Sequence, residues 1–117
     1  MDKALWAAQI FVAMVFTVTG GLKVLVPREK LATKMHWASE WTDARVKLLG
    51  VAEVLGAVGL IAPLASGVAP FLTPLAALCL ALLLVGAVYT HRRLGEGYAP
   101  AVLVLALCLV IAVGRAP

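Results

Sequence analysis

Charged residues are scarce in this chain of 117 residues. Lys and Arg number ten and Asp and Glu six, so 14% of the chain is charged, against about 25% in an ordinary soluble domain. Apolar residues make up 63%, and the mean hydropathy is +1.02. A soluble domain this small buries only about 60–70% of the surface that its unfolded chain exposes, so it could not hide this much apolar surface from water. The composition excludes a soluble globule and predicts one domain in a lipid bilayer.

Recognisable chemical motifs are also few. The chain has two cysteines, Cys79 and Cys108, which form no C-x-x-C pair and fall at different predicted depths, so dithiol redox chemistry is not expected and both are interpreted as small packing residues. No Gly-rich phosphate loop or nucleophile elbow is present. His36 and Glu40 could share a helical face, but two ligands are too few for a metal site. The net charge is +4, and the sequence contains no nucleic-acid-binding motif. We therefore expect the basic residues to face anionic lipid headgroups.

Long apolar segments dominate the rest of the sequence. Four runs, each near the roughly 20 residues that a transmembrane helix needs, cover residues 4–26, 47–66, 68–90 and 98–114. They are apolar on all sides and lack strict alternation, and inside a bilayer only helices or closed barrels satisfy the backbone. The sequence therefore predicts an all-α membrane protein: a single domain, residues 1–117, formed by a bundle of four transmembrane helices.

The segment 28–42, between the first and second runs, is mixed in composition. Its apolar residues recur at steps of four, three and three: Leu31, Met35, Ala38 and Trp41. Such a stripe predicts an amphipathic helix lying in the membrane interface, and Trp37 suits the headgroup layer because its ring is apolar with one polar N–H. The helix is interpreted either as an anchor that connects two spans or as a lid over a pocket.

The basic residues predict an orientation. Eight of the ten Lys and Arg flank or occupy the first and third connections, and positively charged short loops stay in the cytoplasm. We therefore expect a multi-pass protein of the plasma or inner membrane, with both termini outside and these two connections cytoplasmic.

Glu53 is the residue that fits its surroundings least. It is the only acidic residue inside a predicted span and lies six residues after Lys47, about 9 Å along the helix. A charge near the bilayer centre costs about 2.5–3.5 kcal/mol or more unless it is paired or faces a wet cavity. Gly50 and Gly56 lie on the same helical face, where small residues allow close helix packing. Glu53 is therefore predicted to point into the bundle.

Two other polar residues fall in the same half of the bilayer. Lys23 lies near the end of the first span and His91 directly follows the third, and Thr19 and Gly20 make the first span small and polar nearby. Two interpretations stay open: a polar pocket that binds a ligand or a proton, or a Lys23–Glu53 pair that only holds helices together, with His91 at the interface.

Four segments resemble the DoxX-like family of small four-helix membrane proteins. They are the end of the first span (residues 16–23), residues 49–63 of the second span with their Gly-x-x-Glu-x-x-Gly motif, residues 71–77, and the end of the third span (residues 87–91). The resemblance implies a membrane bundle, with the family's acidic residue at Glu53 and its basic residue at Lys23. It implies little about chemistry, since relatives include a subunit associated with thiosulfate:quinone oxidation and, more distantly, eukaryotic sterol-binding and receptor-chaperone proteins.

The expected function is that of a binding or accessory protein for a small lipophilic molecule, such as a quinone, isoprenoid, sterol-like compound or lipid, with Glu53 as polar anchor. The candidate ligand-binding residues are Glu53, Lys23, His91, Thr19, Gly20, Gly56 and Trp37. Two alternatives are a membrane oxidoreductase subunit or acid–base isomerase, with Glu53 and His91 as catalytic candidates, and a small proton-coupled exporter. Because four spans leave little interior and Gly-rich faces favour pairing, a homo-oligomer is also expected.

Overall fold

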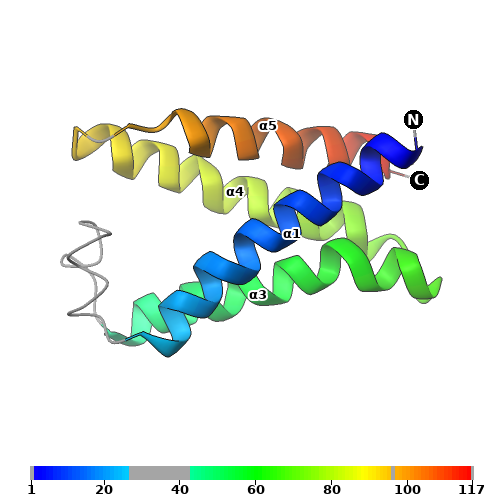
Figure 1. Ribbon diagram of the computed structural model, residues 1–117, viewed down its shortest axis with the longest axis horizontal. Helices are drawn as coiled ribbons and strands as arrows, with labels where there is room; N and C mark the ends of the chain where they lie inside the picture. The colour runs from blue at the N-terminus through cyan, green and yellow to red at the C-terminus, as the bar shows by residue number, and fades with distance from the viewer. Residues whose placement is uncertain (1, 27–42, 96, 117) are drawn as a thin grey trace.

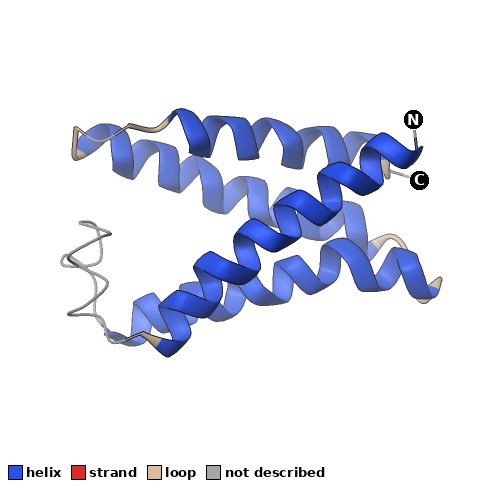
Figure 2. Ribbon diagram, in the orientation of Figure 1, coloured by secondary structure: helices blue, strands red, loops and turns tan. Residues whose placement is uncertain are grey.

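The computed structural model describes residues 2–26, 43–95 and 97–116, and in this part of the chain all regular structure is helical (Figure 2). The helices are α1 (Asp2–Leu25), α3 (Asp43–Ser66), α4 (Leu72–Arg93) and α5 (Ala99–Gly114). The predicted four-helix bundle is confirmed. The predicted interfacial helix, with Trp37, lies outside the described residues.

Three of the helices are long and apolar enough to cross a membrane: α1, α3 and α4. The fourth, α5, is apolar but has 16 residues, which gives a length of about 24 Å at 1.5 Å per residue, short of a hydrocarbon core of about 30 Å. The helix α4 begins four residues later than the predicted span because the preceding turn holds Gly67 and Ala69 at positive φ, 77° and 50°. Pro74 then falls in the first turn of α4, where its missing N–H costs no hydrogen bond.

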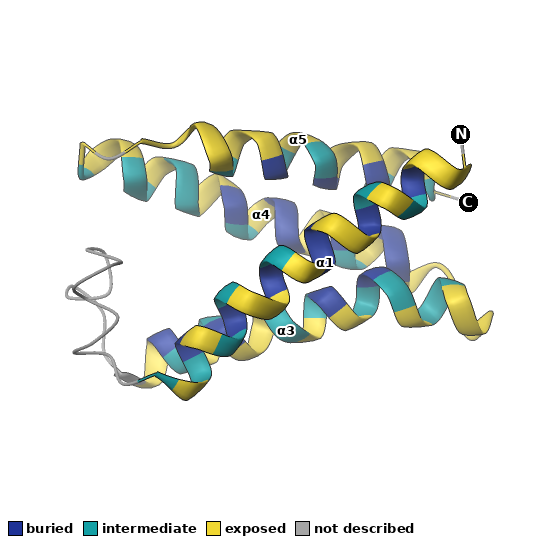
Figure 3. Ribbon diagram, in the orientation of Figure 1, coloured by how far each residue is buried: buried dark blue, intermediate teal, exposed yellow. Residues whose placement is uncertain are grey.

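The helices form two packed pairs, α1 with α3 and α4 with α5, and α3 also packs against α4. Figure 1 shows α1 crossing the bundle: it lies beside α5 at the end that holds both termini and beside α3 at the opposite end. The inner faces carry the buried core, which includes Val12, Leu60, Leu80 and Ile111. The outer faces are exposed and apolar (Figure 3), as expected of surfaces that contact lipid chains.

The cysteines occupy different environments. Cys108 is fully buried in the core, whereas Cys79 is exposed, and both are free thiols. The expectation of two packing residues therefore holds for Cys108 and is wrong for Cys79, which lies on the outer face of α4 because neighbouring helices cover only one side of it.

A polar network ties the helices together at the end that holds the termini. Gln9 is fully buried, and its Nε2 donates to the carbonyl of Leu60 at 2.7 Å. Arg115 donates to Gln9 Oε1 at 2.7 Å and to Asp2 Oδ1 at 2.6 Å, and its guanidinium lies 5.4 Å from the centre of the Trp6 ring. The network links α1, α3 and the end of α5.

Candidate functional site

Glu53 points between α3 and α1 and is 6% exposed. The Nζ atom of Lys23, equally buried, lies 2.7 Å from Oε1 and 2.6 Å from Oε2 of the carboxylate. The hydroxyl of Thr19 donates to Oε1 at a longer distance, 3.4 Å. Each charge therefore has its opposite within direct hydrogen-bond distance, which lowers the cost of holding both in an apolar bundle.

Two glycines make this contact possible. A Cβ atom added to Gly20 would lie 2.7 Å from the carbonyl oxygen of Gly50, and one added to Gly50 would lie 2.7 Å from the carbonyl oxygen of Gly20. The backbones of α1 and α3 thus touch where neither residue has a side chain. Lys23 and Glu53 each follow their glycine by three residues, which places them on the same helical faces one turn further along. The two Gly-x-x-charged motifs therefore form one helix contact.

Gly56 serves a different contact. A Cβ atom added there would lie 2.6 Å from Cδ2 of Leu80 on α4. Gly20 and Gly56 are thus helix-packing residues and are not among the residues that line the cavity described next. Their small size was a correct signal of close packing, but the structure places both away from the surface that a ligand in this cavity would touch.

A cavity of about 440 Å³ lies beside the ion pair, and all four described helices contribute to its wall. The polar side chains in the wall are Thr19, Lys23, Glu53, Thr90 and His91. Most of the remaining lining is apolar and includes Phe16, Leu49, Leu83, Ala87, Ala101 and Val104. The volume is within the range of about 300–1,000 Å³ found for small-molecule sites, which are mostly apolar with a few polar groups.

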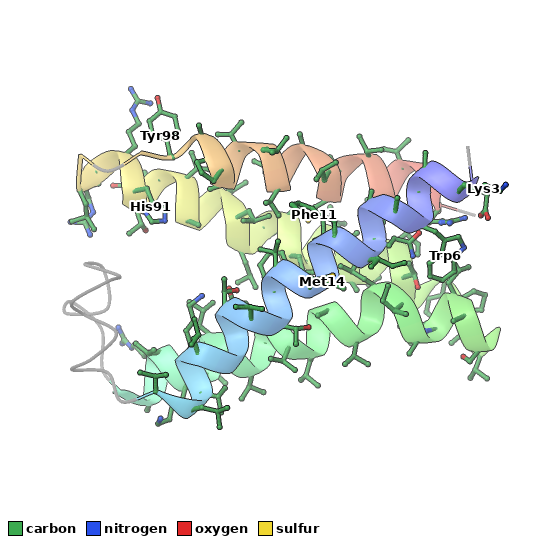
Figure 4. All side chains as sticks on the ribbon, viewed as in Figure 1. Lys3, Trp6, Phe11, Met14, His91 and Tyr98 are labelled. Atoms are coloured by element: carbon green, nitrogen blue, oxygen red, sulfur yellow. The ribbon has the colours of Figure 1, made fainter. Side chains whose placement is uncertain are left out.

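The structure thus brings four of the seven candidate residues, Thr19, Lys23, Glu53 and His91, to one cavity. Figure 4 shows His91 near the end of α4 that lies opposite Lys3 and Trp6. The position of Trp37 is outside the described residues. The apolar wall from α4 and α5 was not predicted, because these helices are apolar all round and their sequence carries no signal for which face borders a cavity.

Basic side chains gather at the end of the bundle where the polar wall lies. Arg92 and Arg93 end α4, and Arg45 and Lys47 lie in the first turns of α3. Lys47 Nζ donates to the carbonyl of Val24 at 3.0 Å and so satisfies one of the last carbonyls of α1. This end therefore presents an excess of positive charge among the side chains that the structure describes.

Comparison with known protein families matches residues 7–114 to the DoxX-like family. The chain belongs to the DoxX-like family. A search of curated proteins and a search of solved structures gave no match. The matched region of this DoxX-like membrane protein contains the two Gly-x-x-charged motifs and His91, as the resemblance of these motifs implied.

Proposed function

We propose that this DoxX-like protein binds a small lipophilic molecule in the cavity between its helix pairs, with Glu53 as the polar anchor. The observation that carries the proposal is the cavity itself: about 440 Å³, with mostly apolar walls and with Lys23, Glu53, Thr19 and His91 on its surface. A hydrocarbon body would contact the apolar residues, and a polar end would reach the Glu53 carboxylate.

A purely structural ion pair explains these features less well. Replacing a buried ion pair by apolar residues is often neutral or stabilising, so a contact between two helices does not require one. This chain keeps an ion pair inside the membrane and also leaves a large volume open beside it. A scaffold requires neither feature, whereas a binding site uses both.

Filling the cavity should remove the ligand. Ala87 lies in the cavity wall, so Ala87→Phe places a ring in the space that the ligand needs. We expect the variant, purified in mild detergent, to retain at least about tenfold less lipophile than the wild type, a change of about 1.4 kcal/mol or more. Native mass spectrometry and analysis of organic extracts measure the bound molecule.

The matched control is Ala106→Phe, because Ala106 is exposed on the outer face of α5 and does not line the cavity. It should retain as much ligand as the wild type. Equal retention by both Phe variants, or no retained lipophile in the wild type, would contradict the proposal.

An acid–base enzyme is the second candidate, favoured by the placement of Glu53 and His91 on one cavity. A carboxylate and an imidazole can pass a proton to and from a bound molecule. If the wild type converts the retained molecule and His91→Ala binds it without conversion, the enzyme replaces the accessory protein as the proposal.

We also propose an orientation in the cell membrane, with both termini outside. The basic residues Arg45, Lys47, Arg92 and Arg93 lie at the end opposite the termini, and short basic connections stay cytoplasmic. Protease added to intact cells should therefore remove epitope tags from both termini. Tags that are cleaved only after the membrane is opened would reverse the assignment.

A further inference from the structure

We infer that the polar end of the ligand is a neutral hydroxyl group that donates a hydrogen bond to Glu53. The ligand class is then a lipophilic alcohol, phenol or hydroquinone, and not the corresponding ketone or quinone. This inference rests on the proposed binding function and names the ligand class for the same cavity.

Three of the side-chain donors described on the cavity wall, those of Lys23, Thr19 and Thr90, already donate to acceptors in the protein. Lys23 donates to both oxygens of Glu53, and Thr19 donates to Oε1. The hydroxyl of Thr90 donates to the carbonyl of Gly86 on its own helix, at 2.8 Å. Lys23 and His91 are each engaged in further interactions. A ligand carbonyl, which can only accept, would have to displace one of these hydrogen bonds in order to bond Lys23, Thr19 or Thr90.

Glu53, in contrast, can accept a further hydrogen bond. A carboxylate offers about four lone-pair positions. Glu53 uses two on Oε1, for Lys23 and Thr19, and one on Oε2, for Lys23, so one position on Oε2 stays open in the described structure. The hydroxyl oxygens of Thr19 and Thr90 donate and retain lone pairs of their own. The open hydrogen-bonding capacity of these side chains therefore suits a ligand that donates.

The charges of Lys23 and Glu53 also limit which donor group a ligand can carry. A cationic amine could donate to Glu53, but the ammonium of Lys23 lies 2.6–2.7 Å from both carboxylate oxygens and would repel a second cation placed there. An anionic end group would meet the carboxylate itself. A neutral hydroxyl avoids both repulsions, and the apolar remainder of the wall fits a hydrocarbon body.

Matched probes test the donor requirement. The full chain, in nanodiscs of phosphatidylcholine, is equilibrated with tetradecanol, with the methyl ketone and the primary amine of the same chain length, and with the alkane. The amount of each bound above that in empty nanodiscs is measured. We expect the alcohol to bind at least about tenfold more tightly than the ketone, because only the alcohol can donate a hydrogen bond to the open position on Oε2 of Glu53. We expect the amine to bind no better than the ketone.

A second arm compares an alkyl hydroquinone with its quinone, where the same preference for the reduced form is expected. Tighter binding of the hydroquinone than of the alcohol would identify an aromatic diol as the ligand, and the reverse order would identify a chain alcohol. Either order supports the hydroxyl, whereas a preference for quinone over hydroquinone would overturn it.

Variants show whether the discrimination comes from this site. The double variant Lys23→Met/Glu53→Met removes the acceptor without stranding a charge, so it should still bind the hydrocarbon chain while the preference for alcohol over ketone disappears. Thr17→Val is the control for loss of a hydroxyl on α1 outside the cavity. The hydroxyl of Thr17 donates to the carbonyl of Ala13 in its own helix, and Thr17 does not line the cavity. This variant should keep the full preference.

The outcomes separate the two proposals. If no probe binds the wild type, the binding function fails and the hydroxyl inference fails with it. If alcohol and ketone bind equally, or if the amine binds best, the cavity is a binding site but the inference is wrong. A preference that persists in the double variant would also overturn it, since Glu53 would then not be the acceptor.

Discussion

Replacing Glu53 by Met while Lys23 is kept is expected to lower the free energy of unfolding by about 3–5 kcal/mol, the usual cost of breaking a buried ion pair on one side. The ammonium of Lys23 is 2.6–2.7 Å from both carboxylate oxygens, and without them this buried charge loses the opposite charge that offsets the cost of its burial. Unfolding in detergent micelles, followed by circular dichroism, gives the measurement.

The double variant Lys23→Met/Glu53→Met should recover most of this loss, because no charge is then stranded and both methionines are apolar. The matched control is Lys3→Met, since Lys3 is exposed at the start of α1 and should change stability by no more than about 0.5 kcal/mol. A double-mutant cycle gives the coupling energy. Effects that simply add would mean that the two residues do not stabilise each other.

Gly20→Ala is expected to destabilise the fold by about 1–3 kcal/mol, as overpacking does in a close-packed interior. The added Cβ atom would lie 2.7 Å from the carbonyl oxygen of Gly50 and 2.9 Å from a methyl carbon of Val54. A backbone oxygen cannot rotate away, so α1 and α3 must move apart. The movement would also stretch the Lys23–Glu53 contact one turn further along.

Gly21→Ala provides the control on the adjacent residue. A Cβ atom at Gly21 meets nothing within 4 Å, and alanine has the higher helix propensity, so this variant should be neutral or more stable by up to about 1 kcal/mol. Thermal unfolding in the same detergent compares the two. Equal effects at both positions would show that helix propensity, and not the α1–α3 contact, determines the result.

Hydropathy predicted the helices because a bilayer imposes a length on every span. Hydropathy predicted the ends of the helices less well. The second span was expected to begin at Lys47, yet α3 begins at Asp43, since a helix can continue past the apolar region and carry charged residues at its end. The late start of α4 depends on the turn at Gly67 and Ala69, and the positive φ of an alanine is not visible in the sequence.

The site was predictable to the extent that it is polar. Lys23 and Glu53 stand out because charges are rare inside apolar segments, and their shared depth follows from the rise of a helix. The apolar wall from Leu83, Ala87, Ala101 and Val104 was not predictable, because the rotation of each helix depends on its packing. The small size of Gly20 and Gly56 correctly indicated close helix packing. Only coordinates, however, distinguish a glycine that touches a neighbouring helix from one that borders a cavity.

The pairing of Lys23 with Glu53 also affects how this polar centre responds to membrane voltage. A single charge moved across the bilayer exchanges about 2.3 kcal/mol with a potential of 100 mV. The ammonium and the carboxylate lie side by side and carry opposite charges, so the field pulls them in opposite directions and exerts no net force on the pair. Movement of the intact pair through the membrane field therefore carries no net charge across it.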